Sequence, residues 1–425
     1  MPVVFKIRSK HKTKNSMIND ITKYLDVSHN NSNNMSSNNS LQKYIELQIN
    51  NTSNLEHIYD NIQTIDRIGT NNSSKSDMNG STYETPNSKI QIKVGSFIGK
   101  GSFGNVYNAT LINNTTQQSV LLDKFDDLSI RLSNIHQLDV IVKSQLIKRG
   151  HSNNITKILT EYLIHLLLNY NTKTSRFIPR LYCVYKHRNT ILFVMEKLNG
   201  QTLDQFISYS KKTNKNSDII QNNYNQKFID CFKQIAMILF MLQKYYKFSH
   251  GDLKPNNIIL VPTTKSYITI NGEKIKTHGV LVKIIDFGFS CIQTESGNNI
   301  IVPGTIYNNN ICNKQFVDLL FLIIRVVRKS FAYKYNVPAN FKKECRILVE
   351  QLLKIVGLKH HDNLIIGEND ITSDSQSNIA VINKSKSKIE YRIVLGISDK
   401  YNSFKHKKEL LAFTPKEIFK MLNRL

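Results

Sequence analysis

The chain has 425 residues, which allows roughly two to four domains, and 40% of its residues are hydrophobic although Trp is absent. Its formal net charge is +25, of which residues 91–425 carry +23, because residues 1–90 hold ten Lys and Arg against eight Asp and Glu. No apolar run reaches the ~18 residues of a membrane span, and the cationic N-terminus lacks an apolar signal core. We therefore expect a cytoplasmic chain with no transmembrane segment.

The positive charge has two interpretations. Lys and Arg are dispersed among many Asn residues and form only short runs, which favours a general compositional bias. A basic face that binds acidic protein substrates, nucleic acid or an anionic surface is the alternative. No nucleic-acid-binding motif accompanies the charge, so the first interpretation is preferred.

Residues 1–88 differ in composition from the rest of the chain. They contain 16 Asn, many of them in the tract His29–Ser40, and little apolar sequence. Such a segment buries too little apolar surface to offset the entropy that is lost on ordering. We therefore predict a disordered tail over residues 1–88 and a folded domain over residues 89–425.

A β-rich pattern begins at Ile90. Ile90, Ile92 and Val94 alternate with polar residues, which predicts a strand, and the helical spacing of apolar residues in Asn154–Leu168 predicts a helix. The predicted strands are Ile90–Val94, Asn105–Leu111, Val140–Lys143, Leu181–Tyr185 and Thr190–Glu196. Residues 89–198 are thus expected to form a small, mostly antiparallel sheet with one helix.

Residues 199–425 have a mainly helical pattern. Apolar residues share one face of a predicted helix at Gln226–Tyr246, and a long apolar helix is predicted at Lys314–Val327. An Asn-Gly pair at Asn271, between apolar runs, predicts a β-hairpin. A last helix is predicted to begin at Thr414, where the spacing is that of a capping box. The fold class expected for the chain is therefore α+β.

Three glycines, Gly99, Gly101 and Gly104, lie between two predicted strands. In a dinucleotide-binding protein a helix would follow this GxGxxG spacing, whereas the residues after Gly104 are β-prone. Glycines let a backbone bend and approach a ligand closely. The pattern favours a flap whose N–H groups cover a triphosphate, with an ordinary hairpin turn as the alternative.

Lys143 ends the predicted strand Val140–Lys143. A buried cation at this point can hold phosphate oxygens if a carboxylate orients it. Glu161 is the only acidic residue between Lys143 and Met195, and it lies in the predicted helix. We therefore predict that Lys143 pairs with Glu161, the alternative being a surface Lys at the end of a strand.

Two further segments carry groups suited to phosphoryl transfer. In SHGDLKPNNIIL, Asp252 can accept the proton of an attacking hydroxyl and Lys254 can stabilise the transferring phosphoryl group. Asn257, and Asp286 at the end of an apolar strand, supply the hard oxygen ligands that Mg²⁺ prefers. Each residue alone would fit an ordinary turn, but their order and spacing predict a magnesium-dependent phosphoryl-transfer site.

Together these motifs resemble those of the eukaryotic-type protein kinases, from about Ile90 to the C-terminus. The resemblance implies a bilobal fold, with a small antiparallel β N-lobe and a larger helical C-lobe, and it implies ATP and Mg²⁺ as cofactors. It makes Asp252 the catalytic base. The residues that it places around ATP are Ile98, Gly99, Lys100, Gly101, Ser102, Phe103, Gly104, Val106, Ile141, Lys143, Glu161, Met195, Glu196, Leu198, Ile259 and Asp286.

The resemblance implies roles for residues outside the ATP site as well. Lys254, two residues after the base, is typical of serine/threonine kinases, and Thr305 in a Gly-Thr pair is expected to contact the catalytic Asp and Lys. His250 and Phe287 are expected to pack together in an apolar spine. Asp318, in the predicted long helix, is expected to anchor the catalytic loop.

The chain also departs from the family pattern. Gly251 stands where most protein kinases have Arg, and no APE motif follows Tyr307. Ile141 replaces the usual Ala two residues before the strand Lys. These departures concern activation and peptide docking rather than the groups that bind MgATP. These departures from the family pattern, the inserted segments between the motifs and the high content of Asn and Lys also resemble features of kinases from large DNA viruses.

The sequence therefore predicts a divergent serine/threonine protein kinase whose activity does not depend on an activation-loop phosphate. Two alternatives remain open. A small-molecule phosphotransferase of the aminoglycoside/choline kinase type often shows His-Gly-Asp, as this chain does at Asp252. A pseudokinase that acts as a binding module is the other alternative, against which the intact Lys143, Asn257 and Asp286 argue.

Overall fold

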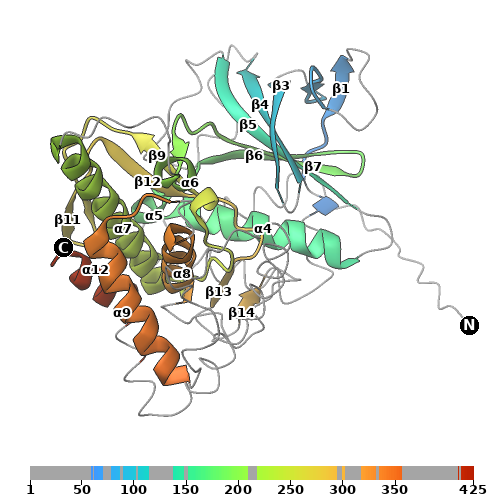
Figure 1. Ribbon diagram of the computed structural model, residues 1–425. Helices are drawn as coiled ribbons and strands as arrows, with labels where there is room; N and C mark the ends of the chain where they lie inside the picture. Colours follow the sequence, from blue (N-terminus) through green and yellow to red (C-terminus); the bar gives the residue numbers. More distant parts are fainter. Residues whose placement is uncertain are drawn as a thin grey trace, which may run out of the picture.

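The computed structural model describes residues 59–60, 62–69, 78–86, 90–101, 104–113, 137–147, 152–208, 218–293, 299–301, 317–331, 335–356, 410 and 413–425. They form two lobes: a curled antiparallel sheet beside one long helix, and a larger, mainly helical lobe (Figure 1). The predicted α+β bilobal fold is confirmed. Among these residues, no helix is long and apolar enough to cross a membrane.

The first lobe is built on a seven-stranded sheet. Its strands are β1 (Asp66–Gly69), β2 (Thr82–Glu84), β3 (Ile90–Gly101), β4 (Gly104–Asn113), β5 (Gln137–Leu146), β6 (Leu181–His187) and β7 (Thr190–Glu196). They lie in the order β1-β2-β3-β4-β5-β7-β6, and every neighbouring pair is antiparallel. Just before β1, Thr64 bridges to Lys186 on β6, at the other edge, so the sheet curls almost into a barrel.

The two faces of β7 bury side chains in different cores. Leu192 and Val194 point into the small core inside the curled sheet. Ile191 and Phe193 point the other way, into the large core that the sheet shares with the helical lobe. Successive residues of a strand alternate between its faces, so a continuous apolar run such as β7 indicates a strand that is covered on both sides.

Residues 62–69 and 78–86 belong to the folded part, although we expected that part to begin after residue 88. β2 pairs with β3, and β1 pairs with β2. Ile65 and Tyr83 are 1% and 3% exposed within the core of the curled sheet. The folded part therefore extends upstream of the expected boundary, because an existing sheet edge supplies hydrogen-bond partners to short polar strands. Residues 1–58 lie outside the described residues.

The described part of the second lobe contains most of the helices. Helix α4 (Ser152–Tyr170) lies beside the sheet of the first lobe. The other described helices are α5 (Thr172–Ser175), α6 (Leu203–Ile207), α7 (Asp218–Tyr246), the 3-10 helix η2 (Pro255–Asn257), α8 (Val317–Phe331), α9 (Ala339–Val356) and α12 (Pro415–Leu422). The strands are β8 (Gln201–Thr202), β9 (Ile258–Pro262), β10 (Tyr267–Ile270), β11 (Glu273–Lys276), β12 (Val280–Ile284), β13 (Cys291–Gln293) and β14 (Asn299–Ile301). The helices predicted from apolar spacing are all present, as is the hairpin β10–β11 at Asn271.

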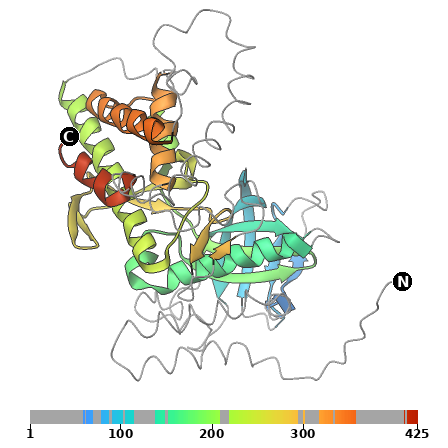
Figure 2. The same cartoon turned by 90° about the horizontal axis from the view of Figure 1, so that it is seen from below.

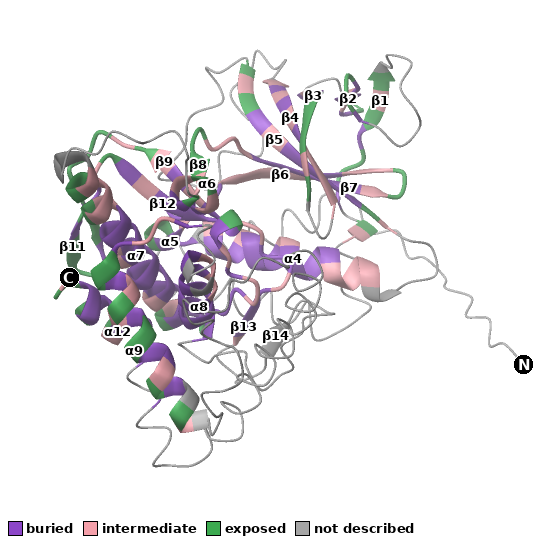
Figure 3. Cartoon of the chain, viewed as in Figure 1, coloured by how far each residue is buried: buried purple, intermediate pink, exposed green. Residues whose placement is uncertain are grey.

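Helices α7 and α8 form the centre of the large core. Both are mostly buried (Figure 3), and α8 is fully buried at Leu319, Leu322 and Ile323. Seen from below, α4 runs along the sheet while α9 and α12 lie on the far side of the helical lobe (Figure 2). Because its apolar residues fix α8 in the core, the polar residues of α8 are held in defined positions where they contact neighbouring loops.

Candidate active site

The pairing of β9 with β12 brings two predicted motifs together. Ile258, which begins β9, pairs with Ile284, which ends β12. The N–H of Ile285 then donates to the carbonyl oxygen of Asn257 at 3.0 Å. The loop before β9 and the loop after β12 therefore lie side by side. They carry Asp252, Lys254, Asn257 and Asp286.

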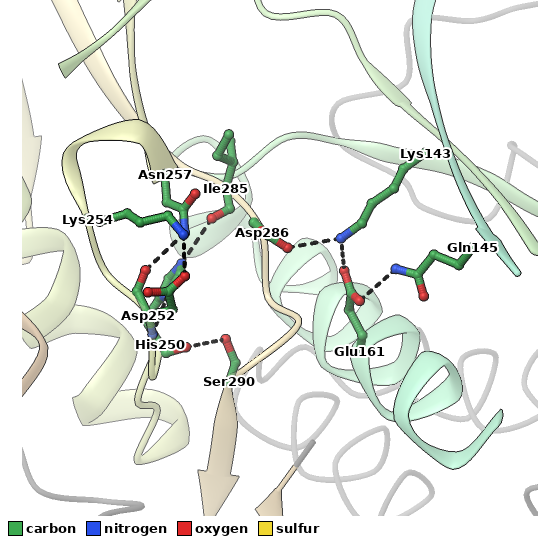
Figure 4. Close-up of polar contacts among 10 residues, drawn as sticks. All are labelled: Lys143, Gln145, Glu161, His250, Asp252, Lys254, Asn257, Ile285, Asp286 and Ser290. Carbon is green, nitrogen blue, oxygen red and sulfur yellow. Dashed lines mark hydrogen bonds and ion pairs between the residues drawn. The ribbon is translucent and has the colours of Figure 1, made fainter. Parts of the chain in front are cut away.

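Lys143 on β5 reaches these loops from the other lobe. Its Nζ lies 2.6 Å from Oε1 of Glu161 on α4 and 2.9 Å from Oδ1 of Asp286 (Figure 4). Lys143 and Glu161 are only 7% and 4% exposed. The contact between them that the sequence predicts is therefore present, and Asp286 extends it into a cluster that joins the two lobes.

The charges of this cluster stabilise one another. Burial alone would lower the pKa of Lys143, but Glu161 and Asp286 raise it above the ordinary value. Burial alone would likewise raise the pKa of Asp286, but Lys143 holds it below the ordinary value. Lys143 is therefore a permanent cation and Asp286 a permanent anion near neutral pH.

Gln145 is a residue of this cluster that the sequence reasoning missed. It lies two residues after Lys143, on the same face of β5, and its Nε2 donates to Oε2 of Glu161 at 2.8 Å (Figure 4). Gln145 is 1% exposed. Both carboxylate oxygens of Glu161 are thus held from β5. The available signal was a polar residue two positions from Lys143, which alternation places on the same side of the strand.

The loop before β9 is fixed by its own side chains. Nζ of Lys254 lies 2.5 Å from Oδ2 of Asp252, and Nδ2 of Asn257 donates to the backbone oxygen of Asp252 at 2.9 Å. Asp318, near the start of α8, accepts hydrogen bonds from the N–H groups of His250, at 2.7 Å, and Gly251, at 3.0 Å. The anchoring contact expected of Asp318 is therefore present.

Phe287 packs inward while Asp286 points toward Lys143. Asp286 has a positive φ of 67°, which is uncommon for a residue other than Gly. The Phe287 ring is 1% exposed, with its centroid 5.0 Å from that of His165 on α4 and 5.9 Å from that of His250. The expected contact of His250 with Phe287 is present, and His165 joins it from α4.

Gly251 has a structural reason to lack a side chain. Its φ is +77°, and a Cβ at this position would overlap the carbonyl oxygen of Phe289. Ser249 and Cys291 exchange two backbone hydrogen bonds of 2.9 Å, and Oγ of Ser290 donates to the carbonyl oxygen of His250 at 3.2 Å. The segment after Asp286 is therefore packed directly on the backbone of the loop before β9.

The residues predicted around ATP come from both lobes. In the strand register Val106 lies opposite Lys143, and Ile141 lies opposite Met195. Ile259 lies on β9 of the helical lobe, and Ile98 on β3 is 52% exposed. Three of the predicted site residues, Ser102, Phe103 and Thr305, lie outside the described residues.

The last residue of β7, Glu196, connects the lobes through an ion pair. Oε2 of Glu196 lies 2.6 Å from Nζ of Lys283 on β12 and accepts a hydrogen bond from the N–H of Arg180 at 3.0 Å. The N–H of Glu196 donates to the carbonyl oxygen of Arg180. Of the two predicted ATP-site residues in the segment 196–198, Glu196 therefore already uses its N–H, and Leu198 accepts a hydrogen bond from the N–H of Gly200 at 3.0 Å through its carbonyl oxygen.

The fold and this arrangement of charged residues are those of a protein kinase domain. The family model "Protein kinase domain" matches residues 92–317, more than half of the chain. The chain therefore belongs to the protein kinase domain family.

Two similar proteins come from Invertebrate iridescent virus 3. "Probable kinase 098L" is 28% identical over 153 residues, 35% of this chain and 27% of that protein. "Uncharacterized protein 038R" is 26% identical over 214 residues, 42% of this chain and 38% of that protein. The chain thus matches less than half the length of either relative. Among solved structures, the BubR1 kinase domain is similar with a TM-score of 0.41 and 15% identity, covering 87% of this chain and 98% of that one.

Proposed function

We propose that the protein is a serine/threonine protein kinase that transfers the γ-phosphate of ATP, with Mg²⁺, to hydroxyl groups of proteins. The observation that carries this proposal is the buried Lys143 ammonium, which contacts both Glu161 and Asp286. Burying such a cluster costs desolvation free energy. The presence of this cluster beside Asp252 and Asn257 favours a role in phosphate binding over a purely structural role.

The donor atoms near Asp286 fit a magnesium ion. Nδ2 of Asn257 is committed to the backbone oxygen of Asp252, which turns the amide oxygen of Asn257 the other way. Asp286 uses Oδ1 for Lys143, so Oδ2 is the oxygen that it would offer. Carboxylate and amide oxygens are the ligands that Mg²⁺ prefers. When bound, the ion would neutralise charge on the phosphates of ATP.

The protein's own groups supply the rest of the reaction. Lys143 would hold the α- and β-phosphates of ATP, and the backbone between Gly99 and Gly104 would cover them. Asp252 would accept the hydrogen bond of the attacking hydroxyl, and Lys254, already 2.5 Å from Oδ2 of Asp252, would stabilise the transferring phosphoryl group.

The packing of Gly251 supports activity that does not depend on an activation-loop phosphate. An Arg before the catalytic Asp usually receives that phosphate, and Gly251 has no such side chain. Instead, the paired backbones of Ser249 and Cys291 and the hydrogen bond from Ser290 hold the segment after Asp286 against the catalytic loop. We infer that these contacts take the place of the phosphate.

Phosphorylation by the purified chain and its Asp252→Asn variant tests the proposal. Both proteins are incubated with Mg²⁺ and labelled ATP on basic and acidic protein substrates, and the labelled amino acids are identified. We expect phosphoserine and phosphothreonine from the unmodified protein only. Equal labelling by the two proteins would contradict the role of Asp252, and phosphotyrosine as the sole product would contradict the serine/threonine assignment.

The same preparations separate the two alternative functions. Labelling of sugars, choline or aminoglycosides without labelling of any protein would identify a small-molecule phosphotransferase. Failure of MgATP to raise the melting temperature would identify a binding module without kinase activity. A Lys143→Met variant serves as the control for nucleotide binding, because it removes the cation that contacts the phosphates.

A further inference from the structure

Helix α8 contacts the catalytic loop at a second point, which no sequence motif predicts. Nη1 of Arg325 donates to the carbonyl oxygen of Leu253 at 2.9 Å and lies 3.6 Å from Oδ1 of Asp252. The Arg325 side chain is 19% exposed, and the Asp252 side chain is 21% exposed. A guanidinium group thus reaches the proposed catalytic base from the core helix of the lobe.

Arg325 and Asp318 lie on the same face of α8. They are seven residues apart, which is close to two helical turns, so their side chains project in nearly the same direction about 10 Å apart along the axis. Asp318 accepts the N–H groups of His250 and Gly251. Arg325 donates to the carbonyl of Leu253 and faces the carboxylate of Asp252. The negative side chain of Asp318 therefore binds N–H donors, and the positive side chain of Arg325 binds acceptor oxygens. The four residues that they contact, 250–253, are consecutive in the loop.

Arg325 also completes the charges around Asp252. Lys254 lies on the Oδ2 side of the carboxylate and Arg325 on the Oδ1 side. The terminal torsion of an Asp side chain is soft, so one cation alone leaves the carboxylate free to rotate. Gly251, the neighbour before the base, supplies no side chain to prevent this rotation. A second cation from α8 fixes the plane of the carboxylate.

We propose that Arg325 is a positioning residue for phosphoryl transfer, which fixes the Asp252 carboxylate and the Leu253 backbone from α8 in a loop that has Gly before the base. Its effect on rate rests on the proposed kinase function. Its effect on the loop rests on the contacts alone. Lys143, Glu161 and Asp286 are held by their contacts with one another, so removal of Arg325 should leave nucleotide binding intact.

Single-turnover kinetics of Arg325→Gln test the effect on rate. Misplacing a catalytic group by about 1 Å costs up to about 100-fold in rate, so we expect phosphoryl transfer to slow about 10- to 100-fold while the KM for ATP changes less than about two-fold. Arg346→Gln on α9 is the matched control, because this Arg is exposed and, among the described residues, its ion pair is a helical i,i+4 contact with Glu350. We expect it to keep the unmodified rate.

Two rescue experiments distinguish positioning from a general structural role. Arg325→Lys keeps a cation and should recover part of the rate, and dilute guanidinium should speed up an Arg325→Ala variant. Neither change restores a protein that is simply misfolded. A transfer rate for Arg325→Gln within two-fold of the unmodified protein, or a parallel loss of ATP binding and melting temperature, would overturn the proposal.

Hydrogen exchange gives a result that does not depend on activity. In Arg325→Gln, amide exchange should rise in a peptide that covers Asp252 to Asn257, whereas β12 should keep its protection. Unchanged exchange would contradict the proposed contact even if the protein proved inactive on every substrate. Conversely, an inactive unmodified protein with the expected exchange pattern would contradict the proposed function and leave the positioning of the loop by Arg325 supported.

Discussion

Gly251 stands where most protein kinases have Arg, and its surroundings leave no room for a side chain. We predict that Gly251→Ala lowers the free energy of unfolding by about 2–4 kcal/mol, because the positive φ of 77° and the overlap with the Phe289 carbonyl both add cost. Urea unfolding measures this change. Gly279→Ala is the matched control, since Gly279 has a φ of +78° but open space around it. Equal losses in the two variants would show that the overlap is absent.

His165 makes stability depend on pH. Burial lowers its pKa from 6.5 to about 4, and Nε2 must carry the proton because it faces the carbonyl oxygen of Pro179 at 2.9 Å. The unfolded chain therefore binds a proton below pH 6.5 that the folded protein refuses until about pH 4. We predict that the free energy of unfolding falls over this range by about 3 kcal/mol through this residue alone.

Comparison with His165→Gln isolates the effect of His165 from that of other titrating groups. Gln keeps a donor that can face the Pro179 carbonyl but does not titrate. Urea unfolding at several pH values should show a shallower decline for the variant between pH 6.5 and 4, with parallel curves above pH 7. Parallel curves over the whole range would contradict the lowered pKa of His165.

Helix α4 is tied to the segment after Asp286 by more than the Lys143 cluster. Nζ of Lys157, one turn before Glu161, lies 5.1 Å from the centroid of the Phe289 ring. We predict a coupling of about 0.5–1 kcal/mol between Lys157→Met and Phe289→Leu in a double-mutant cycle of unfolding free energies. Lys157→Arg should retain the coupling, because it keeps a cation over the ring. Strictly additive single changes would show that the contact contributes nothing.

The elements differ in how far their sequence predicts them. The apolar spacing of α4, α7 and α8, the alternation at the start of β3 and the apolar run of β7 are local patterns, so these elements were predictable. The pairing of Lys143 with Glu161 was predictable too, because no other acidic residue was available. The contact of Arg325 was not, because it depends on how α8 lies against the catalytic loop, which no local period determines.

The two lobes form one site because ion pairs cross between them. Lys143 on β5 contacts Asp286, and Glu196 at the end of β7 contacts Lys283 on β12. Lys143, Glu196 and Lys283 lie on strands and Asp286 follows β12 by two residues, so the sheet of one lobe and the β9–β12 ladder of the other set the geometry. Composition predicts neither pair. It predicted only that enough apolar residues existed to build the cores that hold these strands.

The upstream strands provide a last test of where the folded molecule begins. A chain that starts at residue 59 keeps β1 and β2, whereas a chain that starts at residue 89, the boundary expected from composition, loses both. The shorter chain also loses the buried Ile65 and Tyr83 and turns β3 into an open sheet edge.

Removing buried side chains of this size costs about 1.5–3 kcal/mol each, and open edges promote aggregation. We predict that the chain that starts at residue 89 has a lower melting temperature and a greater tendency to aggregate than the chain that starts at residue 59, measured by calorimetry and light scattering. Equal melting temperatures for the two chains would show that β1 and β2 add nothing to the stability of the sheet.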